Sequence, residues 1–219
     1  AEEAAGIYSP EKQKAALDRY CEKALQAWDI IDLSNLPEEN THIATQKLLL
    51  RQLYMPLRLT VEIGRDHGCV DSTFAELEEH RKTRRLREAG YEDNDEPATT
   101  SQKERSSVGE RLGIARRIVV LGDPGGGKTT MMRWMATAYL LRYRNDPSFK
   151  KIPDTQTLPD RCWIPVLIRC RDIGEDDLCR SFTDFLSLHL RKTELLPEDA
   201  DVMRAVILDS IAKGDALLL

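Results

Sequence analysis

Eight consecutive residues carry the clearest chemical signal in this sequence. Residues 122–129 read G-D-P-G-G-G-K-T and match the pattern G-x-x-x-x-G-K-[ST] of a phosphate-binding loop. Glycines let a backbone adopt positive φ and approach a phosphate without an intervening Cβ, so successive N–H groups can point into one concavity. With the residue that follows, the predicted nucleotide-binding residues are Gly122, Asp123, Pro124, Gly125, Gly126, Gly127, Lys128, Thr129 and Thr130.

Three side chains at the end of this loop have distinct expected roles. Lys128 is expected to reach the β- and γ-phosphates and is the one catalytic residue that we predict. The Thr129 hydroxyl is expected to ligate Mg²⁺, and Thr130 to contribute its amide or hydroxyl near the α-phosphate. A chance glycine-rich turn is the alternative interpretation. The agreement of the flanking elements with the motif favours nucleotide binding.

The segments around the loop predict the elements that position it. The apolar run 118–121 predicts a strand that enters the loop, and an amphipathic helix pattern follows. Such a helix would turn its unpaired N–H groups and positive dipole end toward the phosphates. The apolar face of this helix is predicted to comprise Met131, Trp134, Met135, Ala138 and Leu141.

The remainder of the chain continues the alternation of strand and helix. Residues 163–168 predict a strand covered on both faces, two helices follow, and residues 216–219 begin a third strand after Gly214. The first helix is expected to bury Phe182, Phe185, Leu186 and His189, and the second Met203, Val206, Ile207 and Ile211. The order β-α-β-α-β predicts an α/β fold with a parallel sheet, as in a P-loop NTPase core.

Hydrolysis of a bound nucleotide stays open at this point. It needs an acidic residue at the end of a neighbouring strand to hold Mg²⁺. Asp215 precedes the last apolar run and so lies at the wrong end of that strand, whereas Asp172 follows a strand and is nearer the ligand-binding edge. A loop or cap role is the simpler interpretation of Asp172, and surface ion pairs are the simpler one for Arg169 and Arg171.

The N-terminal part predicts a separate, mostly helical region. Ser9 and Pro10 are placed to begin a helix whose buried face has Ala16, Tyr20, Ala24, Ala27 and Ile31. A second Leu-rich segment covers residues 43–53, and residues 57–63 alternate as a strand does. We therefore expect an accessory region at residues 1–90, a linker or mobile loop at 91–107, and the NTPase domain at 108–219.

A charged helix pattern covers residues 74–89 and includes a basic run at 81–87. The run could bind a nucleic acid or an acidic partner. However, Glu78 precedes Lys82 by four residues, and Arg84 precedes Glu88 by four, which favours a solvated face with internal ion pairs. Nothing in the sequence connects this run with the nucleotide.

Composition excludes several classes of protein. The 219 residues carry a net charge of −5 and are 41% hydrophobic, which predicts a globular chain without a general attraction to nucleic acid or to an anionic membrane. No apolar run approaches the roughly 18 residues of a membrane helix, so we expect a cytoplasmic protein. The five cysteines (Cys21, Cys69, Cys162, Cys170 and Cys179) show neither disulfide nor zinc spacing and are expected to be reduced structural thiols.

Three segments together resemble the NACHT domains, the signal-transduction NTPases of the STAND class. Residues 117–136 look like the Walker A loop of that family, residues 164–173 like its second strand, and residues 213–219 like the lead into its Walker B strand. Upstream, residues 53–59 resemble a segment that often precedes NACHT modules. The resemblance covers residues 108–219 well and 43–63 weakly, and on it we expect the chain to stop at the Walker B strand, before the catalytic acids.

The resemblance implies a molecular switch in which ADP holds a closed monomer and ATP with Mg²⁺ opens it to self-associate in the full-length protein. The loop itself does not distinguish ATP from GTP, because base selection lies outside it. Two alternatives remain: a turnover enzyme, such as a P-loop kinase or a motor-type ATPase, and a scaffold that binds nucleotide without hydrolysis. The trigger, the effector and the residues after Leu219 are not given by the sequence.

Overall fold

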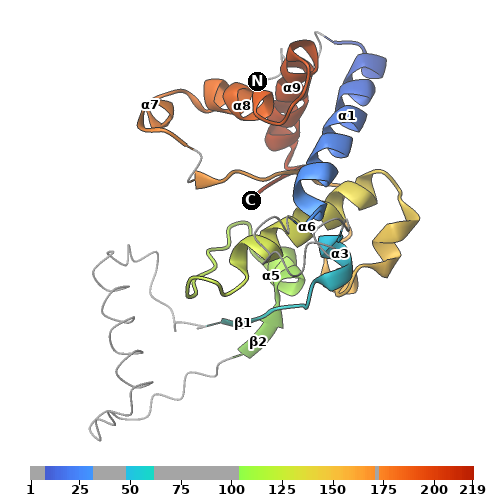
Figure 1. Ribbon diagram of the computed structural model, residues 1–219, viewed down its shortest axis with the longest axis vertical. Helices are drawn as coiled ribbons and strands as arrows, with labels where there is room; N and C mark the ends of the chain where they lie inside the picture. The colour runs from blue at the N-terminus through green and yellow to red at the C-terminus, as the bar shows by residue number, and fades with distance from the viewer. Residues whose placement is uncertain (1–7, 32–47, 62–103, 171–172) are drawn as a thin grey trace, which may run out of the picture. The chain divides into compact units, whose positions relative to one another are not determined.

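A computed structural model describes residues 8–31, 48–61, 104–170 and 173–219 of the chain (Figure 1). The chain divides into a larger compact unit, residues 1–57 with 107–219, and a smaller one, residues 58–106. This division joins the N-terminal helix and the phosphate-loop region in one unit, whereas the sequence suggested separate regions. The described helices are α1 (Pro10–Asp29), α3 (Leu50–Leu53), α5 (Val108–Ile114), α6 (Lys128–Tyr143), α7 (Glu175–Leu178), α8 (Phe182–Arg191) and α9 (Pro197–Lys213), with 3-10 turns η3 (Pro147–Lys151) and η4 (Thr155–Thr157).

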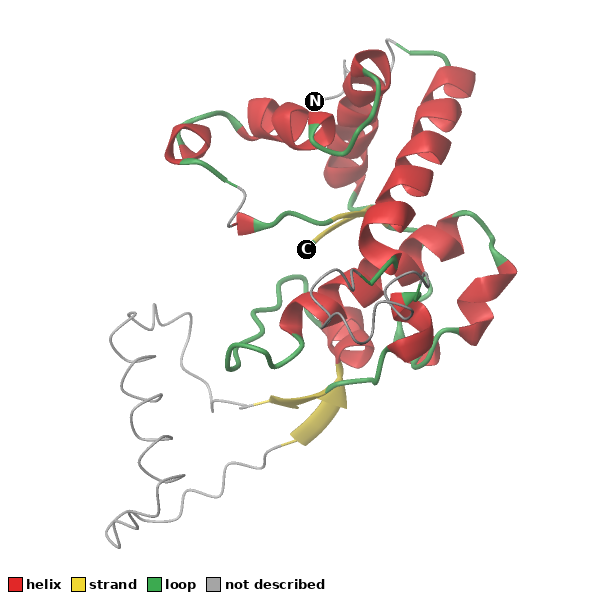
Figure 2. Ribbon diagram, viewed as in Figure 1, coloured by secondary structure: helices red, strands yellow, loops and turns green. Residues whose placement is uncertain are grey.

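Two short strands of the larger unit pair in parallel. β3 (Ile164–Val166) is buried along its whole length, and β4 (Ala216–Leu218) pairs with it in the register Ile164 to Ala216 and Val166 to Leu218. The connection between the two strands contains α7, α8 and α9, which accords with the long crossover that parallel strands require (Figure 2). The larger unit is thus a mixed helix and strand structure with a small parallel sheet, and both of these strands were expected.

The expected strand at residues 118–121 does not form. This segment has no regular secondary structure, and the side chains of Val119 and Leu121 are 83% and 68% exposed. An apolar run indicates that burial would be favourable, but a strand also needs a neighbour that accepts its hydrogen bonds. In the described part of the chain the parallel sheet consists of β3 and β4 alone.

The core of the larger unit lies where α1, α6, α8 and α9 pack on β3. α1 contacts both α6 and α9, and α8 lies against α9 (Figure 1). The predicted apolar face of α6 is confirmed, because all five of its residues are buried. The helix is also buried on its other sides in its second half, at Ala136, Thr137, Tyr139 and Leu140. α6 is therefore a central helix rather than a surface helix.

α1 begins as the sequence predicts. Ser9 is its N-cap and accepts a hydrogen bond from the Lys12 amide at 3.4 Å, and Pro10 occupies the first turn. Of the expected face, Ala16, Tyr20 and Ala24 are buried, but Ala27 is exposed. Trp28 takes its place and packs edge to face on Tyr20, with ring centroids 6.2 Å apart.

The helix α8 buries other residues than expected. Leu186 and Leu190 are fully buried, whereas Phe182 is 44% exposed and Phe185 and His189 are only partly buried. Two leucines four residues apart cover one narrow stripe, and the aromatic residues lie at its margin. In α9, by contrast, Met203 and Ile207 are buried as predicted, with Val206 and Ile211 partly buried.

The turn after α9 follows the prediction. Gly214 adopts a left-handed conformation (φ 79°) at the C-cap and donates to the Ile211 carbonyl oxygen at 3.2 Å. The next residue, Asp215, accepts a hydrogen bond from the Ile164 amide. The acceptor is the backbone carbonyl oxygen of Asp215, and this residue lies just before β4, as the sequence predicts.

The described part of the smaller unit is a pair of strands, β1 (Arg58–Val61) and β2 (Glu104–Ser107). β1 confirms the alternating pattern, with Leu59 partly buried between exposed Arg58 and Thr60. β2 corrects the expected linker, whose last four residues form a strand. Ser107 then starts α5 with a capping box, because its hydroxyl accepts from the Glu110 amide and its amide donates to the Glu110 carboxylate. The charged pattern at 74–89 and the basic run 81–87 lie outside the described residues.

Four cysteines lie in the described residues, and all four are free thiols. Cys21 is buried in the core, and burial raises its pKa to about 12. Cys162, Cys170 and Cys179 are exposed, so they are not the packed structural thiols that we expected. Among the described residues, no helix combines the length and the apolar character that crossing a bilayer requires.

Candidate functional site

The glycine loop, residues 122–129, lies at the N-terminal end of α6. Gly125 (φ 81°) and Gly127 (φ 79°) are both left-handed, and Gly127 is the N-cap of the helix. A side chain at either position would be strained, because left-handed backbone costs about 1–2 kcal/mol for a residue with a Cβ. Between them the Gly126 amide donates to the Asp123 carbonyl oxygen at 3.1 Å, which closes a tight turn. The two glycines thus adopt the positive φ that the sequence analysis expects of a phosphate-binding loop.

Lys128 folds back across this loop. Its ammonium donates hydrogen bonds to the carbonyl oxygens of Gly122 and Asp123, each at 2.8 Å. The side chain thereby closes the mouth of the loop and holds a positive charge beside the N-terminal end of α6.

The N-terminal end of α6 presents donors that the helix cannot use. The first described intrahelical bond here joins the Met131 amide to the Gly127 carbonyl oxygen, and no side chain caps this end. The amides of Lys128, Thr129 and Thr130 therefore point out of the first turn. Both threonines are exposed, as are residues 121–126. The predicted site residues thus form one contiguous, accessible surface with a positive helix end.

These residues fit a magnesium ion that arrives with a nucleotide. The described residues contain no group of three His, Cys, Asp or Glu side chains that could hold a metal ion. Mg²⁺ bound with a nucleotide needs little more than one or two protein oxygens, because phosphates and water complete its coordination. The exposed hydroxyl of Thr129 would supply one such oxygen, and the ion would neutralise phosphate charge there.

A second segment, residues 48–57, packs against the loop and against α6; we call it the bridging segment. A Cβ placed on Gly127 would lie 3.1 Å from Cδ1 of Leu57, so the Leu57 side chain covers this glycine. Tyr54 stacks on Trp134 of α6 with ring centroids 4.8 Å apart, and its hydroxyl accepts a hydrogen bond from the Leu57 amide at 3.4 Å. The motif alone gives no sign of this contact.

The other end of the bridging segment is fixed to the end of α1. The Ile31 amide donates to the Leu48 carbonyl oxygen at 2.9 Å, and Ile30 and Leu49 form an antiparallel bridge. Asp29, the last residue of α1, accepts from the Arg51 amide and pairs with its guanidinium, both at 3.1 Å. Burial raises the pKa of Asp29, and the Arg51 amide and guanidinium oppose this shift.

Arg133 connects α6 with the same end of α1. Its guanidinium donates to the carbonyl oxygens of Trp28 at 2.8 Å and Ile30 at 2.6 Å, which the helix leaves without amide partners. Burial lowers the pKa of Arg133, and the charge of Arg169 lowers it further. The sequence analysis did not identify Arg133, because no pattern within α6 indicates that its partner is the end of α1.

The other candidate residues do not join the loop. Asp215 lies before β4, and Arg169 is partly buried, close enough to Arg133 to affect its pKa, and pairs with no carboxylate among the described residues. Asp172 and Arg171 lie outside the described residues, so their expected roles remain predictions. Within the described part of the chain, the loop residues alone make up the predicted site.

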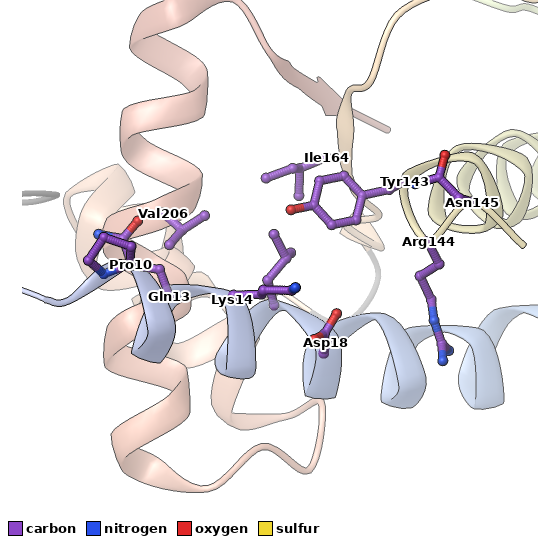
Figure 3. A pocket seen from close by; sticks show the side chains of 10 residues that line it. Pro10, Gln13, Lys14, Asp18, Tyr143, Arg144, Asn145, Ile164 and Val206 are labelled. Carbon is purple, nitrogen blue, oxygen red and sulfur yellow. The ribbon is translucent and has the colours of Figure 1, made fainter.

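A hollow of about 530 Å³ lies at the opposite end of α6, between the start of α1, β3 and α9 (Figure 3). Tyr143 and Lys14 extend into it, with Asp18 and Arg144 at its side (Figure 3). α6 has 16 residues and is therefore about 24 Å long, so this hollow is remote from the loop. It contains none of the predicted nucleotide-binding residues, and its lining includes the carboxylate of Asp18 beside the cations of Lys14 and Arg144.

Comparisons with family models, with curated proteins and with solved structures returned no match. The functional argument therefore depends on the chain's own residues and their geometry.

Proposed function

We propose that this chain binds a nucleoside triphosphate or diphosphate through the glycine loop, with ATP and ADP favoured over GTP by the NACHT resemblance alone, and that it is the nucleotide-binding part of a NACHT-type switch. The observation that carries the proposal is the loop itself. Two left-handed glycines and the first turn of α6 present backbone donors on an exposed surface, and Lys128 closes over them. Anions bind such helix ends because the free N–H groups and the helix dipole act together.

The charge of Lys128 is central to the proposed binding. Its ammonium holds two neutral carbonyl oxygens, which are weaker partners than a phosphate. Bound nucleotide would draw the ammonium away from Gly122 and Asp123 and toward the β- and γ-phosphates. Thr129 would hold the Mg²⁺ that accompanies the nucleotide. Exchange of ADP for ATP at this loop would then open the protein and promote self-association.

Fluorescent ATP and ADP analogues, titrated with and without Mg²⁺, test the proposal. We expect saturable binding that Lys128→Ala weakens at least about tenfold, because a hydrogen bond to a charged group contributes about 1.5–3 kcal/mol. Lys150→Ala, which removes the same charge from an exposed position, is the matched control and should bind as the wild type does. Thr129→Ala should lose mainly the part of the nucleotide affinity that depends on Mg²⁺.

Two outcomes would count against the proposal. Equal affinity of the wild type and Lys128→Ala, with both proteins folded by circular dichroism, would exclude the loop as the site. For the switch, size-exclusion profiles with ADP and with a non-hydrolysable ATP analogue should differ, and identical profiles would favour a scaffold. Steady turnover with a small phosphate acceptor would favour a kinase instead.

A further inference from the structure

The bridging segment contacts the glycine loop at one end and the end of α1 at the other. Leu57 covers Gly127, and Asp29 pairs with Arg51, so one run of ten residues joins two sites that are distant in the sequence. The side-chain contacts along it are continuous, because Tyr54 links Leu57 to Trp134 of α6.

The end of α1 is held from two directions. The bridging segment holds it through the Ile31 to Leu48 hydrogen bond and the Asp29 to Arg51 pair. α6, the helix that starts at the loop, holds it through Arg133. A displacement of the loop backbone relative to α6 would therefore change the contact with Leu57 at one end of the bridging segment.

We infer that the bridging segment transmits the occupancy of the glycine loop to the C-terminal end of α1. The inference rests on the proposed function and names the regulation of that site. Phosphates would fix the loop backbone beside Leu57, which would steady the bridging segment and its bonds to Ile31 and Asp29. Because coupling between two sites is reciprocal, a change at the end of α1 also alters affinity at the loop.

Three amides, two in the bridging segment and one at the end of α1, report on this coupling. The Ile31 amide donates to Leu48, the Arg51 amide to Asp29, and the Leu57 amide to Tyr54. Hydrogen exchange of the whole chain, with and without MgADP, measures how often each bond opens. We expect MgADP to slow exchange at Ile31 and Arg51 about fivefold or more, which is the lower end of typical coupling factors.

Leu57→Ala removes the contact with Gly127. In this variant MgADP should no longer slow hydrogen exchange of the Ile31 amide, although it should still slow exchange in residues 122–131. Met55→Ala, in the same segment but 81% exposed, is the control and should behave as the wild type does. Arg51→Met breaks the other end and should have the same effect, so a Leu57 variant that fails to fold does not end the test.

The outcomes separate the two proposals. Protection of residues 122–131 by MgADP without any change at Ile31 and Arg51 would overturn the inference and leave the proposed function standing. Slowing at Ile31 that survives in both variants would also overturn it, because the signal would then travel by another route. No protection in the loop would contradict the proposed function and the inference with it.

Discussion

The two ends of α6 are built in different ways. At its N-terminal end the chain is exposed, and its shape is set by the left-handed backbone of Gly125 and Gly127. In its second half the helix is buried on all sides, and Arg142 stacks on the ring of Phe149 at 4.7 Å from its centroid. One end is therefore specified by backbone conformation and the other by side-chain packing.

This difference separates stability from binding. Burial of apolar side chains supplies most of the free energy of folding, whereas an exposed glycine loop contributes little to it. The loop keeps backbone donors free for a ligand, which a packed core cannot do. Substitutions in the core should therefore change the free energy of unfolding, and substitutions in the loop should change affinity.

The largest expected effect comes from a substitution in the packed core. Leu190 on α8 is fully buried, and Leu190→Ala should lower the free energy of unfolding by about 2–5 kcal/mol in urea titrations. α8 packs on α9, so the nucleotide affinity of the folded protein should not change.

Leu196→Ala is the matched control for this prediction. It removes the same atoms from a side chain that is 66% exposed, and its effect should stay within about 0.5 kcal/mol. Equal effects of the two substitutions would mean that the burial of Leu190 does not contribute to stability.

The packed side is also the side that the sequence predicts best. The apolar face of α6, the cap of α1 at Ser9 and the burial of Met203 all follow from residue spacing, because each depends on neighbours within one element. The prediction fails where the outcome depends on another element. Residues 118–121 are apolar enough for a strand, but strand formation requires a pairing partner, which spacing does not reveal.

The next effect compares two glycines with the same backbone. Gly127 and Gly214 both have φ 79°, one before α6 and one after α9. Either glycine replaced by alanine should lower the free energy of unfolding by about 1–2 kcal/mol. A Cβ at Gly214 meets nothing within 4 Å, whereas one at Gly127 presses on Leu57. Of the two variants, only Gly127→Ala should therefore weaken nucleotide binding in addition to lowering stability.

Urea unfolding and nucleotide titration of both variants show whether the loss of binding is specific to the loop. If Gly214→Ala weakened binding as much as Gly127→Ala does, the loss would reflect general destabilisation and not the loop. If Gly127→Ala bound normally, the close approach of the backbone to a phosphate would not be needed. Either result would contradict the distinction between loop substitutions that change affinity and core substitutions that change stability.

The candidate site shows a similar limit of sequence reasoning. The loop residues could be named from the motif, because glycine spacing reports directly on backbone freedom. Leu57, Arg51 and Arg133 could not be assigned a role at the loop, since their contacts join segments that are up to about a hundred residues apart. Arg133 binds carbonyl oxygens of α1, and no pattern within α6 indicates where that partner lies.

The last effect is absent at neutral pH and appears only in alkali. Burial raises the pKa of Cys21 from 9.0 to about 12, so between these values the unfolded chain loses the thiol proton and the folded chain keeps it. Stability must then fall as pH rises, by about 1.4 kcal/mol per pH unit from this group. Cys21→Ala should show a shallower decline than the wild type in urea titrations above pH 9.

Cys162→Ala, which removes an exposed thiol, is the matched control for the loss of a buried one. Parallel slopes for the wild type and Cys21→Ala would show that Cys21 is reached by water in the folded state. The steeper wild-type slope would instead locate the alkaline sensitivity of this chain in the packed helices. Nucleotide affinity of the folded protein at pH 9 should then match in all three proteins, because the thiol lies in the core and the loop binds through backbone donors.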